Sequence, residues 1–366
     1  MSKPTVLILG KIPPPYYGTS VSMLLIMQSA LHQNYTLIPI NTNVHTSLDT
    51  LGKISFNKFK LNLMMYVQLY KTIKKKHPQC AVIPISQTTI GFVKDAMFIW
   101  ICRAMGVKVL VHLHGSVLLD WYNKSNFITR KITYATLTKT QGAIVLGTNL
   151  KYIFEPFLST KKIHVVPNGA NYTYTHTTKI NNQLQVLYLG NLQATKGIID
   201  VIDALVLLKN KYVIPFECTI IGAWRDEATK AQCLKLVTDN TLNVQFKGIV
   251  TGPDKNKYYE QANVFVFTPR APEGHPWVIV EAMAAGLPII STNKGAIKES
   301  VIDNHNGFIV DDNAPQQIAE RLYQLAITPN LITTMSANAL AHYNNNFTET
   351  KMVNQLHTAI DNVLKA

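Results

Sequence analysis

The sequence contains few cysteines and no long hydrophobic run. Its four cysteines form no C-x-x-C pair, so no disulfide framework is expected, and they fit reduced, mostly buried residues of a cytosolic protein. The start, KPTVLILG, holds only a short apolar run before Gly10, which favours a first β-strand over a signal peptide. The apolar run AMFIWIC at 96–102 is far too short to span a bilayer. We therefore expect a cytoplasmic chain that does not cross the membrane.

Several recognition motifs are also missing. The loop after the first expected strand has neither the G-K-[ST] of a Walker loop nor a G-x-G-x-x-G fingerprint. RNA- and DNA-binding signatures are absent, and no repeat recurs at the spacing of a solenoid. With 366 residues, 47% of them hydrophobic, the chain is expected to form ordinary globular cores in two domains.

Acidic residues are scarce only in the first half. Residues 1–170 hold 19 Lys and Arg against 4 Asp and Glu, a net charge of +15, whereas residues 171–366 hold 16 against 17, a net charge of −1. This division supports two domains with different partners. A basic domain suits nucleic acid, an anionic membrane surface or an anionic substrate, or it serves only as a solubilising surface.

Short, β-rich apolar runs alternate with helix-length segments along the whole chain. The first series of expected strands lies at 6–10, 36–40, 81–85, 108–113, 143–146 and 163–166. The second series lies at 185–190, 217–222, 244–247, 264–268, 288–292 and 307–310. Runs that are apolar on both faces predict parallel α/β sheets, here in two doubly wound domains. Ligands of such sheets bind beyond the carboxyl ends of the strands, so we expect the site in the cleft between the domains.

The domain boundary is expected after VVPNGA (165–170). The following polar stretch, 171–183, lacks apolar periodicity and is typical of a linker. We assign residues 1–170 to the first domain and 171–346 to the second. The tail 347–366 has apolar residues at helical spacing and is expected to pack back on the first domain as a helix.

Two loops of the first domain carry candidate ligand contacts. Gly18 precedes an apolar helix whose amides suit a diphosphate, although an ordinary strand–turn–helix corner explains it equally. In VLVHLHGS (109–116), His112 and His114 point to the same side of an extended strand. No third ligand is close in sequence, so we do not expect a metal. His114, at the strand end, is better placed to contact a substrate, and His112 is expected within the sheet.

The second domain opens with VLYLGNLQATKGIIDVIDAL (186–205), which predicts a buried strand, a short loop and an amphipathic helix. Lys196 stands at the start of that helix, where the helix dipole disfavours a cation. A phosphate held between Lys196 and the helix amides would explain this placement. A solvated surface lysine is the structural alternative.

The stretch EGHPWVIVEAMAAGLP at 273–288 has two carboxylates and no other charged side chain. A proline and a glycine near its ends predict a buried helix over 276–285. Glu281 lies in the middle of this helix, where an unpaired charge is costly, and Glu273 lies in the preceding loop. Either Glu281 forms a buried ion pair, with Arg270 as the nearest candidate, or both carboxylates accept hydrogen bonds from the hydroxyls of a sugar-containing ligand.

These segments, with VVPNGA and KGAIKESVIDNHNGFIV, resemble glycosyltransferase family 4, retaining enzymes of the GT-B fold. The similarity is strongest over 185–312, and the paired glutamates followed by AMAAGLP are specific to it. The resemblance implies two Rossmann-like domains that face a cleft. The N-terminal domain would bind the acceptor, and the C-terminal domain would bind a nucleotide-diphosphate sugar, a UDP-sugar by family frequency.

The resemblance also implies roles for residues of the second domain. Glu281 would bind the ribose hydroxyls, and Glu273 would bind the donor sugar. Backbone amides of Gly274, His275 and Trp277 would help to hold that sugar. One position departs from the family, because Asn191 stands where members usually have an arginine. Either neutralisation of the phosphates is weaker here, or another cation such as Arg225 or Arg270 supplies the charge.

Three further residues receive catalytic or donor-binding roles by the same resemblance. Lys196 would neutralise the departing diphosphate, so that no metal cofactor is needed. Gly18 would let the first domain's backbone close on the phosphates, and His114 would lie near the anomeric carbon and the acceptor. The expected mechanism is front-face attack with retention, in which the acceptor hydroxyl loses its proton to a leaving phosphate oxygen and no protein nucleophile takes part.

A basic segment in the first domain indicates where the enzyme acts. Lysines 53, 58, 60, 71, 74, 75 and 76 bracket bulky apolar residues that include Phe56, Phe59, Met64, Met65, Tyr66 and Tyr70. This pattern fits an anionic membrane surface, and a core-facing helix with exposed lysines is the alternative. Because similar bacterial enzymes extend lipid-linked sugars, we expect a glycan or polyprenyl-diphosphate-linked acceptor in cell-surface polysaccharide synthesis, at the inner face of the cell membrane.

Two other classes of protein remain open. A sugar-nucleotide epimerase of similar architecture would also bind a nucleotide sugar, but its acid and base residues cannot be placed in this sequence. A non-catalytic basic protein that binds nucleic acid or membrane would account for the charge alone.

Overall fold

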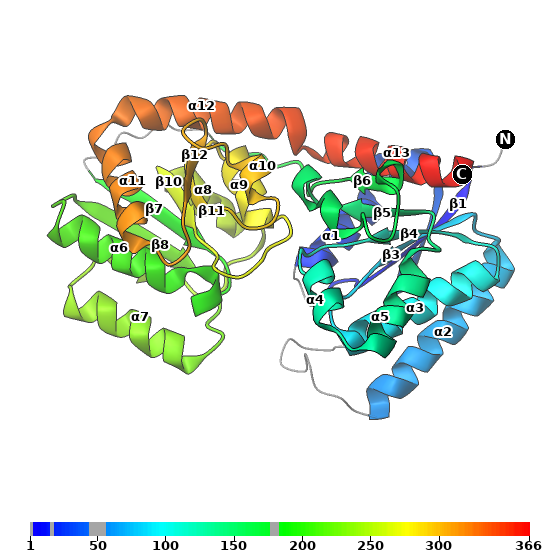
Figure 1. Cartoon of the computed structure of the whole chain (residues 1–366). Coiled ribbons are helices and arrows are strands. Elements are labelled where there is room, and N and C mark those ends of the chain that lie inside the picture. Colours follow the sequence, from blue (N-terminus) through cyan, green and yellow to red (C-terminus); the bar gives the residue numbers. More distant parts are fainter. Residues whose placement is uncertain (1–2, 15–17, 44–55, 176–182) are drawn as a thin grey trace. The chain divides into compact units, whose positions relative to one another are not determined.

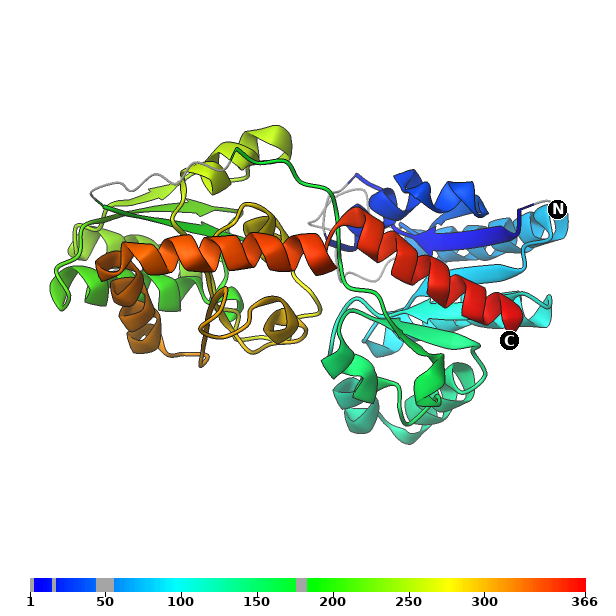
Figure 2. The ribbon, with the colours of Figure 1, turned by 90° about the horizontal axis from the view of Figure 1, so that it is seen from above.

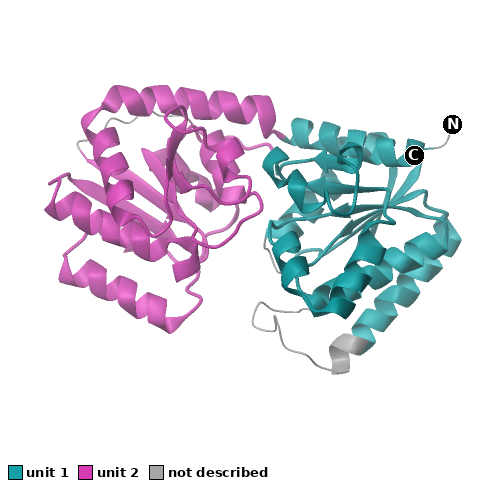
Figure 3. Ribbon diagram, viewed as in Figure 1, with its two compact units in different colours: residues 1–170, 349–366 teal, residues 171–348 magenta. Residues whose placement is uncertain are grey.

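The computed structural model describes residues 3–14, 18–43, 56–175 and 183–366, without the side chains of 56–59. The chain divides into two compact units, residues 1–170 with 349–366 and residues 171–348 (Figure 3). Each unit contains one six-stranded parallel sheet with helices against it. Part of the expected linker, 176–182, and Lys53 with the side chains of Phe56, Lys58 and Phe59 lie outside the described residues.

The sheet of the first unit has the strand order β2-β1-β3-β4-β5-β6. The strands are β1 (Thr5–Gly10), β2 (Thr36–Asn41), β3 (Cys80–Pro84), β4 (Lys108–His112), β5 (Gly142–Val145) and β6 (Ile163–Val165). The central strands are buried almost throughout, because helices cover both faces of the sheet. All neighbouring strands are parallel, so their carboxyl ends meet at one edge.

The helices of the first unit fall on the two sides of this sheet (Figure 1). They are α1 (Gly18–Gln28), α2 (Phe56–Lys76), α3 (Thr89–Ala104), α4 (Leu118–Lys124), α5 (Phe127–Leu137) and the chain-terminal α13 (Glu349–Lys365). Helices α1 and α13 share one core with side chains of β1, β3, β4 and β5. Helix α13 buries Met352, Leu356 and Ile360 there, and the Tyr35 hydroxyl donates to Asp361 Oδ1 at 2.7 Å.

The terminal helix begins slightly later than the sequence pattern predicts. The apolar stripe was expected from residue 347, but Phe347 is the C-cap of the preceding helix and packs into the core of the second unit. The helix that joins the first unit therefore starts at Glu349. Phe347 fits the apolar spacing of the helix before it and of the helix after it, so periodicity alone misplaces the boundary between them.

The sheet of the second unit has the strand order β12-β11-β10-β7-β8-β9, and its neighbours are again parallel. The strands are β7 (Leu184–Leu189), β8 (Phe216–Ile221), β9 (Val244–Phe246), β10 (Val264–Phe267), β11 (Ile289–Thr292) and β12 (Gly307–Val310). The twelve strands expected from the sequence are thus present, with bounds that differ by no more than a residue or two at either end.

Seven helices belong to the described part of the second unit. They are α6 (Ile198–Asn210), α7 (Glu227–Asp239), α8 (Asn256–Gln261), α9 (Trp277–Ala284), α10 (Ile297–Ser300), α11 (Pro315–Ile327) and α12 (Pro329–Asn346). Helix α12 lies lengthwise over this unit (Figure 2), where it packs against α9. Across the described residues, no helix is both long and apolar enough to cross a membrane.

Helix α9 has eight residues rather than the expected ten. Pro276 is its N-cap, with an extended ψ of 129°, and Ala285 is its C-cap. Gly286 follows with a φ of 67°, the left-handed conformation that commonly ends a helix. The helix is apolar all round and buried from Ile279 onward, so its one charged residue lies inside the unit.

Candidate functional site

The loops at the carboxyl edge of the second sheet are joined by backbone hydrogen bonds. The loop after β7 pairs with the loop after β8, because Leu192 N donates to Ala223 O at 2.9 Å. The loop after β10 joins them through Arg270 N, which donates to Thr195 O at 3.0 Å. Segments far apart in the sequence are thereby held as one surface at the edge where ligands of parallel sheets bind.

Two glycines allow these loops to approach closely. A Cβ on Gly197, whose φ is +78°, would lie 2.0 Å from the carbonyl oxygen of Thr268. A Cβ on Gly295, whose φ is +57°, would lie 2.0 Å from the carbonyl oxygen of Glu273. Neither position accepts a side chain without displacing backbone, so both glycines fix the loops that carry the charged residues.

Lys196 and Glu273 form an ion pair at this edge. The Nζ atom of Lys196, the last residue of the 3₁₀ turn Ala194–Lys196, contacts Oε1 of Glu273. The Glu273 side chain is only 13% exposed, and burial raises its pKa, although the ammonium of Lys196 offsets part of this rise. The two residues that the sequence assigned to the diphosphate and the donor sugar are therefore in direct contact.

Glu281 is buried in α9 and has several polar partners. Lys255 Nζ lies 2.6 Å from Oε1, and the hydroxyls of Tyr259 and Tyr172 donate to the carboxylate at 2.8 and 3.4 Å. Burial raises the pKa of both tyrosines, and the Glu281 charge raises it further, so both stay protonated donors. The carboxylate is thus satisfied within the second unit.

Arg270 is not the partner of Glu281, contrary to the sequence-based candidate. Its Nε donates to Asp200 Oδ2 at 2.8 Å, in an ion pair that links the loop after β10 to α6. The side chain of Glu281 is instead neutralised by a lysine from the 3₁₀ turn Gly252–Lys255, just before α8. Proximity in sequence favoured Arg270, but its guanidinium is already paired with Asp200.

The remaining predicted residues of this loop are Gly274, His275 and Trp277. The Gly274 carbonyl accepts a hydrogen bond from Ala296 N at 2.8 Å. The His275 ring is buried, and its Nε2 lies 2.7 Å from Ser300 Oγ. Burial lowers the pKa of His275 to about 3, so the ring is neutral at physiological pH. Trp277 is partly buried at the first position of α9.

Asn191 lies just after β7, and its side chain is hydrogen-bonded to an arginine. Its Oδ1 accepts hydrogen bonds from Arg225 Nε at 3.0 Å and Nη2 at 2.8 Å. Of the two cations that the sequence offered in place of the family arginine, Arg225 therefore lies at Asn191, whereas Arg270 is engaged by Asp200.

Gly18 and His114 belong to the first unit. Gly18 is the first residue of α1, and its carbonyl accepts a hydrogen bond from Ser22 Oγ at 3.0 Å. His114 follows β4, with its ring centroid 4.0 Å from that of His112. Burial lowers the pKa of His114 to about 4, so its ring is neutral at physiological pH.

A cavity of about 290 Å³ opens at the carboxyl edge of the first sheet. Its polar lining includes Lys11, Thr19, Lys94, Asp95, His112 and His114. His112 is 5% exposed, and its Nε2 has no hydrogen-bond partner among the residues that the structure describes. A buried polar atom without a partner suits a water or a ligand hydroxyl in this cavity. The described residues contain no group of three His, Cys, Asp or Glu that could hold a metal ion.

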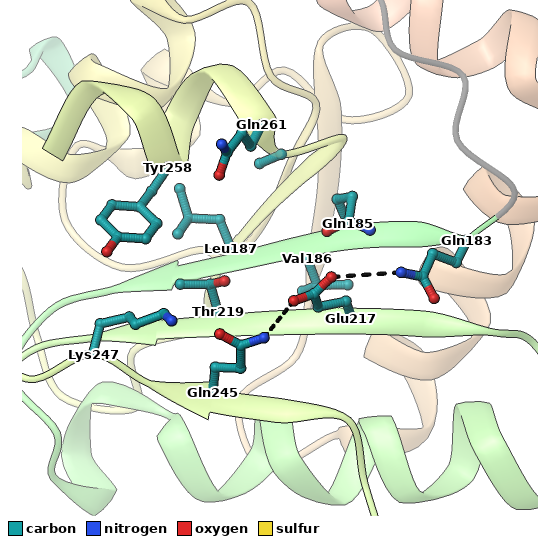
Figure 4. Close-up of a pocket in the computed structure, with 11 residues that line it drawn as sticks. Gln183, Gln185, Val186, Leu187, Glu217, Thr219, Gln245, Lys247, Tyr258 and Gln261 are labelled. Atoms are coloured by element: carbon teal, nitrogen blue, oxygen red, sulfur yellow. Dashed lines mark hydrogen bonds between the residues drawn. The ribbon is translucent and has the colours of Figure 1, made fainter.

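A separate hollow of about 400 Å³ lies between one face of β7, β8 and β9 and the end of α8 (Figure 4). Polar side chains from alternate strand positions line it, with Tyr258 and Gln261 above them, and Gln245 Nε2 donates to Glu217 Oε1 at 2.6 Å. None of the predicted site residues lies there. The alternation of polar residues in these strands was the signal that the sequence analysis did not use.

The buried ion pair of Glu281 yields a stability prediction. Replacing Lys255 by Met leaves the carboxylate buried without a cation, so we expect the free energy of unfolding to fall by about 3–5 kcal/mol. The matched control is Lys257→Met, an exposed lysine two residues away, which is expected to change little. Urea unfolding of both variants measures the difference. Equal stability of the two variants would mean that Lys255 does not compensate Glu281.

Comparison with known proteins finds a family whose model matches the second unit. Residues 175–342, nearly all of the second unit, match the family of glycosyl transferases, group 1. An uncharacterized glycosyltransferase of Methanocaldococcus jannaschii is 24% identical over 265 residues, 68% of this chain and 67% of that protein. The capsular polysaccharide biosynthesis glycosyltransferase CapM of Staphylococcus aureus is 27% identical over 187 residues, 51% of this chain and 48% of that protein. The matched region thus spans 67% of the first relative's length and 48% of the second's.

The likeness extends to the fold of the whole chain. The HepE protein of Anabaena, solved in complex with UDP and glucose, matches with a TM-score of 0.74 at 17% identity, over 98% of this chain and 99% of that one. Two six-stranded parallel sheets with flanking helices are common to both. The chain therefore has the GT-B fold, and residues 175–342 of its second unit match the glycosyl transferases of group 1.

Proposed function

We propose that the protein transfers a hexose-type sugar from a nucleotide-diphosphate donor to a hydroxyl of a glycan or lipid-linked acceptor, in the synthesis of a cell-surface polysaccharide. The observation that carries this proposal is the contact of Lys196 with Glu273 at the carboxyl edge of the second sheet. The family match of the second unit, the UDP in HepE and the capsular role in the name of CapM support it. UDP is the nucleotide we propose.

In this proposal the second unit binds the donor. Glu273 accepts hydrogen bonds from the donor sugar, while amides of the loop at 274–277 contact the same sugar. Glu281 accepts hydrogen bonds from the ribose. The hydroxyls of Tyr172 and Tyr259 and the ammonium of Lys255 keep its carboxylate oriented. Lys196 has further N–H donors beyond the one that Glu273 accepts, and these suit the oxygens of a diphosphate.

The first unit is proposed to bind the acceptor at the cavity beside His114. Since the neutral imidazole of His114 both donates and accepts hydrogen bonds, it can contact hydroxyls without adding charge. Gly18, at the start of α1, lets the backbone approach the donor phosphates. These roles assign Gly18 and His114 to the same reaction as the residues of the second unit.

The proposed mechanism retains the configuration at the anomeric carbon. The acceptor hydroxyl attacks on the face from which the diphosphate departs, and its proton passes to a leaving phosphate oxygen. No side chain forms a covalent bond to the sugar. Lys196 stabilises the charge that develops on the leaving diphosphate, a task that a divalent metal performs in other transferases, and we propose that no metal cofactor is required.

Membrane association is a further part of this proposal, and it rests on α2. The core-facing side of this helix holds Met65, Leu69 and Ile73, which are buried and so unavailable to lipid. On the outer side, Leu63 and Met64 are 54% and 58% exposed. They line a groove of about 550 Å³ together with three lysines of the helix, Lys71, Lys75 and Lys76. Exposed apolar residues beside lysines suit the surface of an anionic bilayer.

Flotation with liposomes tests the membrane proposal. Vesicles with an anionic phospholipid are expected to carry the protein upward at low salt, and neutral vesicles are not. Replacing Leu63 and Met64 by Ser is expected to reduce flotation severalfold without loss of folding, because both side chains are exposed. Absence of binding to anionic vesicles at low salt would refute this part of the proposal.

Nucleotide-sugar binding tests the function itself. Saturation-transfer NMR against a panel of nucleotide sugars is expected to show binding of one or a few donors. Incubation of the bound donor with the protein then separates the two enzyme classes, since an epimerase would change the sugar on its nucleotide without an acceptor. Failure to bind any nucleotide would reject both enzyme classes.

The two glutamates are expected to differ in their kinetic effects. Glu281→Ala removes charge-assisted hydrogen bonds to the ribose and should weaken nucleotide binding by about 10- to 100-fold. Glu273→Ala should chiefly lower kcat, by about 100-fold, because it acts on the sugar at the reacting centre. Calorimetry with UDP and steady-state kinetics with the identified donor measure these two effects. The reverse pattern would contradict the assigned positions.

A further inference from the structure

Four cations at the carboxyl edge of the second sheet are neutralised by carboxylates. The ion pairs there are Lys196 with Glu273, Lys255 with Glu281, Arg270 with Asp200, and Lys294 with Asp312. Each joins one cation to one carboxylate, so each pair is electrically neutral. The net charge of these pairs therefore adds little attraction for an anion such as a diphosphate, and a cation whose charge is not offset would strengthen its binding.

Arg225 is such a cation. Within the described part of the chain it forms no ion pair with a carboxylate, and its guanidinium rests on the neutral amide oxygen of Asn191. The adjacent carboxylate of Asp226 is turned away, because its Oδ1 accepts a hydrogen bond from Thr229 N at 2.7 Å and caps α7. Arg225 is also exposed, so its remaining N–H donors are accessible.

The backbone fixes this arginine beside the loop that leads to Lys196. Arg225 N donates to Leu192 O at 3.1 Å, next to the bridge that pairs Leu192 with Trp224. Leu192 is buried in the core of the unit, so the segment that pairs with Trp224 and Arg225 is anchored there. Both hydrogen bonds to Asn191 come from one edge of the guanidinium, which leaves the other edge free to face a ligand.

We propose that Asn191 positions Arg225 to bind the diphosphate of the donor, so that Arg225 and Lys196 together contact the leaving group. This inference rests on the proposed function and names a residue that the family pattern does not. An amide suits the position better than a carboxylate would, because it orients the guanidinium without neutralising it. Asn191 is thus a positioning residue, and Arg225 supplies the net charge.

Two substitutions distinguish this role from a structural one. Arg225→Gln removes the charge. Asn191→Asp keeps an acceptor for the guanidinium and strengthens the tie between the two loops, but it neutralises Arg225. A merely structural contact would tolerate Asn191→Asp, whereas a phosphate-binding role would not. Lys235→Gln, an exposed lysine of α7 away from this edge, is the matched control.

Calorimetry with UDP, GDP and ADP, and with the corresponding nucleosides, is the measurement. For the diphosphate that binds the wild type, both variants are expected to lose about 10- to 100-fold in affinity. The affinity for the nucleoside should be unchanged, Lys235→Gln should bind as the wild type, and the melting temperatures should stay equal. The loss should also shrink as salt is added, because the interaction is between charges.

Different results would overturn the role of Arg225 and the proposed function. If the wild type binds a nucleoside diphosphate and either variant binds it equally well, Arg225 does not contact the phosphates and only this inference fails. If the wild type binds no nucleoside diphosphate, the proposed function fails and this inference fails with it. Equal losses of diphosphate and nucleoside affinity would show a structural effect and would also overturn it.

Discussion

The need to compensate a charge inside an apolar helix governs the architecture of the second unit. Glu281 sits in α9, which is otherwise entirely apolar, and its charge is tolerated only because Lys255, Tyr259 and Tyr172 surround it. These partners come from segments before β7 and before β10, so the carboxylate joins distant parts of the chain. A single buried charge thus fixes where α8 and the start of the unit meet α9.

The carboxyl edge of the second sheet is held together by its backbone. Loops that follow four different strands are tied by backbone hydrogen bonds and by close contacts at Gly197 and Gly295. The backbone of this edge is therefore fixed by contacts within the unit. Preformed sites of this kind lose little conformational entropy on binding, which favours tight recognition of a polar ligand.

Much of this molecule is predictable from its sequence. The strands are evident because a buried parallel strand is apolar on both faces, and α9 is evident from Pro276 and Gly286 at its ends. The sequence also places Lys196 and Glu273 at one edge of the second sheet, since both follow strands that pair there, but it does not predict their direct contact.

The partners of the charged groups are not predictable in this way. Lys255 lies in a short 3₁₀ turn, and Tyr172 lies in an irregular segment, so no periodicity brings either residue toward Glu281. Arg270 was nearest in sequence, yet it turns to Asp200 because α6 packs beside β10. The hydrogen bonds of Asn191 to Arg225 likewise depend on how two loops pair after β7 and β8. Such contacts depend on three-dimensional packing rather than on local pattern.

The order in which the chain is made has a consequence for the first unit. Helix α13 supplies part of that unit's core, yet it follows the whole of the second unit in the sequence. The second unit is one continuous stretch and is complete in the nascent chain before then. During synthesis the part of the first unit's core that α13 covers must therefore stay exposed until the second unit has been made, which differs from the usual order of domain maturation from the N-terminus.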